Sequence, residues 1–224
     1  MSLGKPTMQN VLITGANRGV GLAMAESLSE RGDRVFGTAR AGSTPGETIS
    51  LDVTDPVSLE ALANHMADEP LDLLVCNAGA FIGRGGIDDP AYTAAAFAEV
   101  MAVNVAGVFL TIQAVLPALR RAKGKIAIIS SQMGSSERSK GGAYIYRASK
   151  AAATNLAMNL SRELAPEGIA VGAYHPGWVR TDMGGAEADI DVETSATGLI
   201  ARFDALTIET TGCFEFYSGE PIPF

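Results

Sequence analysis

The chain alternates between short apolar runs and longer stretches in which apolar residues recur every three or four positions. An apolar run at 9–14 is followed by a helical pattern over 19–31 and by a second apolar run at 35–38. Uninterrupted apolar runs are typical of parallel strands buried on both faces, and the longer spacing is typical of helices. The beginning of the chain therefore predicts a strand, a helix and a strand.

The same alternation continues along the rest of the chain. We expect further strands at 48–51, 71–76, 125–130, 169–174 and 212–216, and helices at 56–66, 91–123, 143–164 and 194–206. Strands that alternate with helices form a parallel sheet that is covered on both faces. The pattern predicts an α/β fold: a single doubly wound domain over residues 1–224, with a mostly parallel sheet of seven strands and helices on both faces. Residues 1–8 are expected to form a disordered N-terminal segment.

One stretch tests this prediction of a globular fold. Residues 100–119 carry no formal charge and are numerous enough to cross a bilayer. The stretch contains Asn104, Gln113 and Pro117, and it has no flanking aromatic belts. We therefore expect a helix that is buried against the sheet, and no membrane span. The mean hydropathy of +0.17 agrees with a large apolar core.

Composition narrows the classes of partner. The chain has 17 Lys and Arg against 25 Asp and Glu, a formal charge of −8, which disfavours binding to nucleic acid or to an anionic membrane. Cys76 and Cys213 are far apart in the sequence, and residues 1–10 lack the apolar region of a secretory signal, so we expect a cytoplasmic protein without a disulfide framework. Two histidines and two scattered cysteines predict no metal site.

A glycine-rich turn follows the first expected strand. It reads Thr14-Gly15-Ala16-Asn17-Arg18-Gly19-Val20-Gly21 and leads into the first expected helix. Glycines permit a tight turn and a close approach of the backbone, and the amides of a helix N-terminus attract a pyrophosphate. This turn predicts a dinucleotide site formed by Gly15, Asn17, Arg18, Gly19, Val20 and Gly21. Three glycines that serve only a turn are the alternative for this motif taken alone.

The end of the second strand indicates which dinucleotide is bound. Folds that prefer NAD commonly place an acid there for the ribose 2′-hydroxyl, whereas this chain has Arg40, 19 residues after Gly21. The guanidinium groups of Arg18 and Arg40 could both bind a 2′-phosphate through charge-assisted hydrogen bonds. We therefore expect NADP(H) as the cofactor. Two solvated surface arginines are the alternative.

A tyrosine and a lysine share one face of the helix expected at 143–164. Tyr146 and Lys150 are four residues apart, and a neighbouring ammonium makes tyrosine a better acid or base by stabilising its phenolate. Ser130 and Ser131 follow the strand before this helix, where a hydroxyl can bind a substrate carbonyl. A Tyr/Lys pair on a solvated face and a serine-rich turn are the alternatives.

Taken together, these motifs resemble the short-chain dehydrogenase/reductase family over nearly the whole chain. The matching motifs, in order, are Gly15-x3-Gly19-x-Gly21, Asp52-Val53, Asn77-Ala78-Gly79, Asn104, Ser131, Tyr146-x3-Lys150 and Pro176-Gly177. The runs 146–152 and 175–183 and the short C-terminal end are similar to the C-factor-like and sniffer-type carbonyl reductases of that family. The resemblance implies a Rossmann-type fold.

The resemblance also implies roles for the four expected catalytic residues. Tyr146 would be the general acid, Lys150 would lower the pKa of that tyrosine and hold ribose hydroxyls, and Ser131 would bind the carbonyl. Asn104 would anchor a water that links Lys150 to solvent. The family often has 13 residues from serine to tyrosine, whereas Ser131 and Tyr146 are 15 apart, so Ser130 stays open as the active serine.

The resemblance also implies further cofactor-binding residues. Asp52 would bind the adenine, and the remaining cofactor contacts would come from Val53, Asn77, Ala78, Gly79, Pro176, Gly177, Val179 and Thr181. Apolar residues expected at the mouth of the substrate pocket are Phe81, Ile82, Met133, Trp178 and Met183. The family places a lid at residues 181–194, which we call the lid segment. It carries Asp182, Glu187, Asp189, Asp191 and Glu193, which would repel anions from the mouth of the site. Carboxylates that point outward and only keep the lid soluble are the alternative.

The sequence therefore predicts an NADPH-dependent oxidoreductase that reduces a small neutral apolar ketone, aldehyde or quinone to the alcohol. A cofactor-sensing NADP-binding protein with incidental turnover is the main alternative, because a fold alone does not fix an activity. An NADP-dependent epimerase or dehydratase is a second alternative. We expect a homodimer or homotetramer whose interface includes the helices around 100–119 and 143–164.

Overall fold

The computed structural model describes residues 8–224 of the chain. The N-terminal segment predicted to be disordered, residues 1–8, lies outside the described residues except for Met8, whose side chain is exposed.

Seven strands form one sheet. They are β1 (Asn10–Thr14), β2 (Arg34–Ala39), β3 (Glu47–Ser50), β4 (Leu73–Cys76), β5 (Lys125–Ile129), β6 (Ala170–His175) and β7 (Phe214–Phe216). Their order across the sheet is β3-β2-β1-β4-β5-β6-β7, and every neighbouring pair is parallel, where the sequence predicted a mostly parallel sheet. The order reverses between β1 and β4. Ligands of such sheets bind at this point, at the carboxyl ends of the strands.

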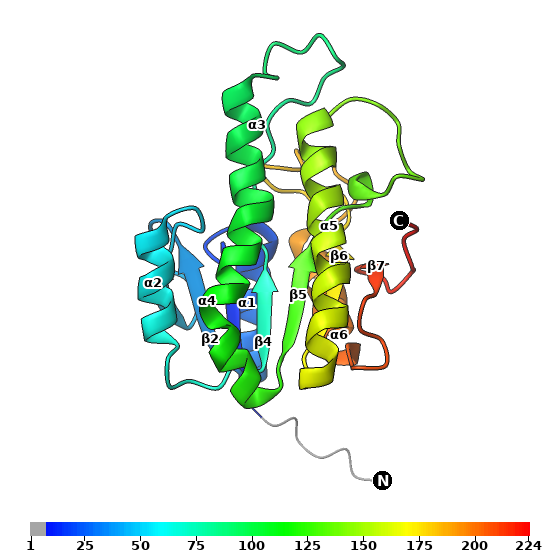
Figure 1. The fold of residues 1–224 in the computed structure, drawn as a ribbon. Coiled ribbons are helices and arrows are strands. Elements are labelled where there is room, and N and C mark those ends of the chain that lie inside the picture. Colours follow the sequence, from blue (N-terminus) through cyan, green and yellow to red (C-terminus); the bar gives the residue numbers. More distant parts are fainter. Residues whose placement is uncertain (1–7) are drawn as a thin grey trace.

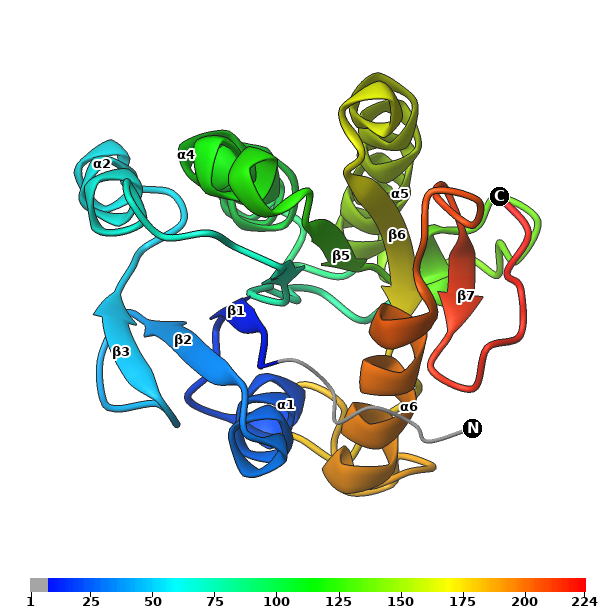
Figure 2. The ribbon, with the colours of Figure 1, turned by 90° about the horizontal axis from the view of Figure 1, so that it is seen from below.

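Helices cover both faces of the sheet. They are α1 (Gly19–Arg31), α2 (Pro56–His65), α3 (Ala94–Met101), α4 (Gly107–Ala122), α5 (Tyr144–Leu164) and α6 (Val192–Ala205). Figure 2 shows α2, α4 and α5 on one face and α1 and α6 on the other. The predicted doubly wound α/β fold of Rossmann type is confirmed.

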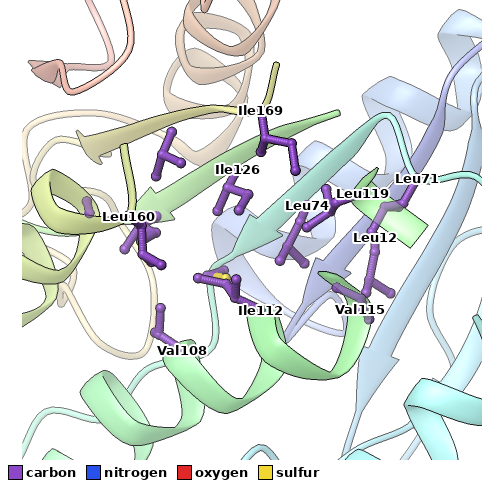
Figure 3. Packing of buried hydrophobic residues seen from close by; sticks show 14 of the residues in the cluster. Leu12, Leu71, Leu74, Val108, Ile112, Val115, Leu119, Ile126, Leu160 and Ile169 are labelled. Atoms are coloured by element: carbon purple, nitrogen blue, oxygen red, sulfur yellow. The ribbon is translucent and has the colours of Figure 1, made fainter. Parts of the chain in front are cut away.

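Apolar side chains join α4 to the sheet. Figure 3 shows Leu74 and Ile126 of the sheet facing Ile112 and Val115 of α4, and all four side chains are at most 2% exposed. A second cluster on the opposite face packs α1 and α6 on the sheet. Because both faces are buried, the strands need uninterrupted apolar runs, which is the pattern seen in the sequence.

The single helix predicted at 91–123 is wrong in one respect. In the structure this segment begins as α3, passes through one π-helical turn at Ala102–Ala106 and continues as α4 (Figure 1). A π turn adds one residue to a helical turn and is frequent at functional sites. Here it coincides with Asn104, whose buried side chain hydrogen-bonds to neighbouring elements. The hydropathy pattern carries no signal for such a turn.

Two predicted strands begin later than expected. The strand predicted at 71–76 begins at Leu73, because the Leu71 amide donates to the carbonyl of Ala118. The strand predicted at 212–216 begins at Phe214, since Gly212 has a φ of 84° that does not fit a strand. The other ends of the strands and helices lie within about three residues of the prediction.

The long apolar segment packs as a core helix. By length and composition alone, residues 94–122 could cross a membrane. In the structure, Val108, Ile112, Val115 and Leu119 of this segment belong to the core on the α4 side of the sheet. The packing agrees with the interpretation of this segment as a helix buried on the sheet.

His175 ends β6 as a buried histidine. It is 6% exposed, and neither ring nitrogen has a hydrogen-bond partner within residues 8–224. Burial and, to a smaller extent, the charges of Arg138 and Lys150 lower the pKa of His175 from 6.5 to about 4. The imidazole is therefore neutral in the folded protein at pH 7.

We expect the stability of the protein to fall in mild acid because of His175. The unfolded chain takes up a proton at a pKa near 6.5 and the folded chain only near 4, so stability is lost as pH falls through this window. The loss is about 3 kcal/mol, at 1.36 kcal/mol for each unit of pKa. Urea unfolding of wild type and His175→Leu at pH 7 and at pH 4.5 measures this loss in the free energy of unfolding. If the free energy of unfolding fell by the same amount between pH 7 and pH 4.5 in wild type and in His175→Leu, this account would be contradicted.

Candidate active site

The predicted site residues come together at the carboxyl ends of the strands. Tyr146 and Lys150 lie on α5, Ser131 follows β5, and Asn104 lies in the π turn. Figure 1 shows β4 and β5 pointing towards the end of the molecule where the loops before α3 and α5 lie. The glycine-rich turn after β1 lies at the same edge, because the sheet is parallel.

Tyr146 is buried under an aromatic ring. Its side chain is 8% exposed, and the ring of Phe81 stacks on it with centroids 4.1 Å apart and planes 10° apart. Burial raises the pKa of the Tyr146 phenol to about 12, while the hydroxyl of Ser131 and the charge of Arg84 act in the opposite direction. The phenol is therefore protonated at neutral pH and can serve as a proton donor.

Lys150 lies beneath the tyrosine. Its Nζ donates a hydrogen bond to the carbonyl of Ile129 at 2.8 Å and lies 5.6 Å from the centroid of the Tyr146 ring. Burial lowers the pKa of Lys150 to about 8. The ammonium is thus held between the end of β5 and the tyrosine, where it can stabilise a phenolate.

The two serines after β5 have different environments. The hydroxyl of Ser131 lies beside the Tyr146 phenol and also accepts a hydrogen bond from the Met133 amide at 3.1 Å. The hydroxyl of Ser130 hydrogen-bonds with Thr154 Oγ1 at 2.6 Å and donates to the carbonyl of Lys150 at 3.1 Å. Ser130 therefore joins β5 to α5, and Ser131 is the serine that adjoins the tyrosine.

Gly134 holds the short helical turn at Gln132–Gly134 against α5. A Cβ at this position would lie 2.6 Å from the carbonyl carbon of Lys150, so only glycine allows this contact. This contact fixes the turn that directly follows Ser131 against the helix that carries Tyr146 and Lys150.

Asn104 ties the π turn to the loop after β4. Its Oδ1 accepts from the Ala80 amide at 2.8 Å, and its Nδ2 donates to the Ala80 carbonyl and to Ser149 Oγ, both at 2.9 Å. The side chain thus positions the loop that carries Phe81. The water relay that the resemblance implies for Asn104 stays a prediction.

The glycine-rich turn has the backbone that its sequence requires. Gly15 and Gly19 have φ of 69° and 55°, and a Cβ on Gly21 would lie 2.2 Å from the Gly15 carbonyl oxygen. Asn77 Nδ2 donates to the carbonyls of Thr14 and Gly15 at 2.9 and 3.1 Å. The Asn77 side chain, which follows β4, therefore holds the turn that follows β1 in place, at the point where the strand order reverses.

The residues expected near the adenosine end lie close together. Asn17 Nδ2 donates to the carbonyl of Ala41, next to Arg40, at 3.2 Å. The Asp52 carboxylate accepts from the amide and hydroxyl of Thr54, and this lowers its pKa together with the charge of Arg40. Arg18 is exposed, 3.5 Å from Asp182 of the lid segment.

The other predicted cofactor residues line the same edge. Val20 follows the turn in α1, Val53 packs on Gly107, the Ala78 amide donates to Thr14 Oγ1, and a Cβ on Gly79 would lie 3.8 Å from Lys150 Nζ. Pro176 and Gly177 follow β6, Val179 is buried, and the Thr181 methyl group faces Gly19. All of these positions lie in the segments that follow β1, β3, β4 and β6 at the carboxyl edge of the sheet, or pack on those segments.

The predicted pocket residues lie around Tyr146, on the lid segment and just before it. Phe81 stacks on the tyrosine and Met133 adjoins Ser131, while Trp178 and Met183 are 47% and 37% exposed. Trp178 Nε1 donates to the carbonyl of Gly184 at 2.8 Å. The exposed pair therefore belongs to the rim of the site.

The lid segment is less uniformly negative than its sequence predicts. Asp182 lies 3.5 Å from Arg18, and Asp191 lies 3.6 Å from Arg180 and also caps α6. Nearby cations thus offset two of the five carboxylates. The expected repulsion of anions is correspondingly weaker.

Sequence reasoning missed Arg84. Its guanidinium lies 4.2 Å over the Phe81 ring and donates to the carbonyl of Met183. The stretch Gly83-Arg84-Gly85-Gly86 belongs to no motif, so only the folded loops reveal this contact. Within residues 8–224, no three His, Cys, Asp or Glu side chains converge as ligands for a metal ion.

A doubly wound sheet with a glycine-rich turn at its reversal point and a Tyr/Lys pair at the same edge defines a nicotinamide-dependent oxidoreductase. The chain belongs to the short chain dehydrogenase family, which matches residues 9–190. Its relatives include C-signal of Myxococcus xanthus, which is 36% identical over 168 residues, or 74% of this chain and 100% of that protein.

Solved carbonyl reductases have the same fold. The NADPH-bound carbonyl reductase from chicken fatty liver is 31% identical, with a TM-score of 0.88 over 97% of this chain and 99% of that one. Carbonyl reductase Sniffer of D. melanogaster is 28% identical, with a TM-score of 0.90 over 97% of this chain and 100% of that one. The expected membership of the family is confirmed.

Proposed function

We propose that the protein is an NADPH-dependent carbonyl reductase that converts a small, neutral, apolar ketone, aldehyde or quinone to the alcohol. The observation that carries this proposal is the convergence of Tyr146, Lys150 and Ser131 on one buried point. The NADPH bound to the chicken carbonyl reductase and the apolar residues around the tyrosine support it.

The N-terminus of α1 fits a dinucleotide. No side chain caps it, its first turn holds no acid, and the glycines in front of it allow a close approach of the pyrophosphate. Arg18 and Arg40 would hold the 2′-phosphate, and Lys150 would hold ribose hydroxyls. When bound, NADPH supplies the hydride for the reduction.

The side chains of the protein would then handle the proton. The Ser131 hydroxyl binds the substrate carbonyl oxygen and orients it towards Tyr146. The Tyr146 hydroxyl gives its proton to this oxygen as negative charge develops on it, and the ammonium of Lys150 stabilises the phenolate that remains. Phe81 covers the ring and excludes water from one face of the tyrosine.

A panel of substrates tests the proposal. Neutral ketones, aldehydes and quinones, together with a carboxylate analogue of one ketone, are assayed with NADPH and with NADH. We expect turnover with NADPH and the highest kcat/KM for neutral apolar compounds. Binding of NADPH without turnover of any compound would favour the alternative, a cofactor-sensing binding protein.

We expect Arg40→Asp to weaken the binding of NADPH by about 10- to 100-fold. The substitution removes charge-assisted hydrogen bonds worth about 1.5–3 kcal/mol and places a carboxylate next to the phosphate. Binding of NADH should be unchanged or tighter, because a carboxylate suits the 2′-hydroxyl. Fluorescence titration with both cofactors measures the change, and Arg162→Asp, an exposed site on α5, is the control. Equal weakening of both cofactors would assign Arg40 a structural role only.

We also propose a cytoplasmic homodimer or homotetramer. The supporting observation is that Phe97 of α3 and Phe109 of α4 are each 42% exposed. Exposed aromatic rings on neighbouring helices suit an interface between subunits. Light scattering at micromolar concentration tests the assembly, and a monomer would refute it.

A further inference from the structure

Three planar groups form a stack over the proposed catalytic tyrosine. The guanidinium of Arg84 lies 4.2 Å from the centroid of the Phe81 ring, and the Phe81 ring lies 4.1 Å from the Tyr146 ring. Arginine over an aromatic face is an attractive arrangement, because the ring presents its negative face to the cation. The contact with Arg84 therefore stabilises the stacked position of Phe81 on the tyrosine.

The same arginine reaches the lid segment. One of its Nη atoms donates a hydrogen bond to the carbonyl of Met183, across 99 residues of sequence. The loop that carries Arg84 is itself fixed, since Asp89 accepts from the amides of Arg84 and Gly85 and the Gly85 carbonyl accepts from Ala143 in front of α5. The guanidinium thus joins an anchored loop to the lid segment directly over the tyrosine.

We propose that Arg84 is a positioning residue of the reductase: it latches the lid segment over Tyr146 and holds Phe81 as the wall of the substrate site. This inference rests on the proposed function for its kinetic consequences, but the latch itself is a property of the chain alone. Two groups from other segments act on the Tyr146 phenol: Ser131 from the end of β5 and Arg84 from the loop after β4. Lys150, on α5 itself, lies with its Nζ 5.6 Å from the centroid of the tyrosine ring. Arg84 is the cation that the lid contact holds in place.

The charge of Arg84 gives the proposal a signature that a purely structural residue lacks. A nearby cation favours the phenolate, so its loss makes the phenol a weaker acid. In alcohol oxidation, which needs the phenolate, the rise of kcat/KM with pH should move to higher pH in Arg84→Met. Arg84→Lys keeps the charge, although it lacks the planar group that stacks, and should keep the wild-type position of this rise.

The lid has its own reporter. Trp178 is the single tryptophan of the chain, and its ring nitrogen donates to the Gly184 carbonyl, the residue after the one that Arg84 binds. If Arg84 holds this segment, its loss frees the indole. We expect quenching of Trp178 fluorescence by acrylamide to rise about twofold in Arg84→Met without any cofactor or substrate, an estimate from the loss of one ordering contact in an exposed segment.

The experiment compares wild type, Arg84→Met, Arg84→Lys and the control Arg34→Met. Arg34 also stacks on a phenylalanine, with its guanidinium 4.5 Å over Phe36, but at the start of β2 on the opposite edge of the sheet. Quenching is measured on the cofactor-free chain. Steady-state oxidation and reduction are measured across pH with saturating cofactor.

We expect Arg84→Met to lower kcat for reduction by about tenfold, as disordered positioning does, with a smaller change in KM. Arg34→Met should match wild type in quenching and in pH profile. Unchanged quenching in Arg84→Met would overturn the latch, and an unchanged pH profile would overturn the electrostatic role. A wild-type protein that turns over no carbonyl would instead overturn the proposed function, and quenching would still decide the latch.

Discussion

Tyr146→Phe should reduce the rate of carbonyl reduction by about 10³-fold or more while the affinity for NADPH stays within about threefold of wild type. General acid catalysis contributes roughly 10²- to 10⁴-fold, and the substitution removes only the hydroxyl that carries the proton. Phenylalanine keeps the ring that stacks on Phe81, so the buried wall of the site is preserved. Steady-state reduction of an activated ketone and fluorescence titration with NADPH measure the two quantities.

Tyr144→Phe is the matched control. Tyr144 lies on the same helix two residues earlier, is 39% exposed and contacts Tyr92 edge to face, away from Lys150. Its loss of a hydroxyl should leave turnover unchanged. If Tyr146→Phe kept wild-type turnover, the assignment of the proton donor would be wrong.

Ser131→Ala should lower kcat by about 10²-fold, whereas Ser130→Ala should keep kcat within about threefold. A hydroxyl that binds the reacting oxygen is worth roughly 10²- to 10³-fold when it is removed. The Ser130 hydroxyl instead bonds to Thr154 and to the Lys150 carbonyl, so its removal should cost about 1–3 kcal/mol of stability. Turnover and urea unfolding of both variants separate the two roles. The reverse ranking in kcat would make Ser130 the carbonyl-binding serine.

The pattern of apolar residues determined most of the fold by itself. Uninterrupted apolar runs predicted the parallel strands, because a strand buried on both faces has no polar side. The glycines at 15, 19 and 21 predicted the turn in front of α1, since positive φ and close backbone contact exclude a Cβ there. Both signals are local, so they can be read without knowledge of the rest of the chain.

The tertiary structure decided what depends on side chains from distant segments. The sequence favoured Ser131 as the active serine but left Ser130 open, and the packing of β5 against α5 directs Ser130 to Thr154 and Ser131 to Tyr146. The π turn at Asn104 depends on hydrogen bonds to Ala80 and Ser149, which lie 24 and 45 residues away.

The pairing of charges around the site also depended on the fold. Five carboxylates of the lid segment predicted a repelling mouth, but Arg18 and Arg180 lie next to two of them, and Arg84 reaches the Met183 carbonyl beside them. Sequence determines which charges exist, because each is a property of one residue. Electrostatic energy depends on the distances between them, and those distances exist only after loops from different strands meet at one edge of the sheet.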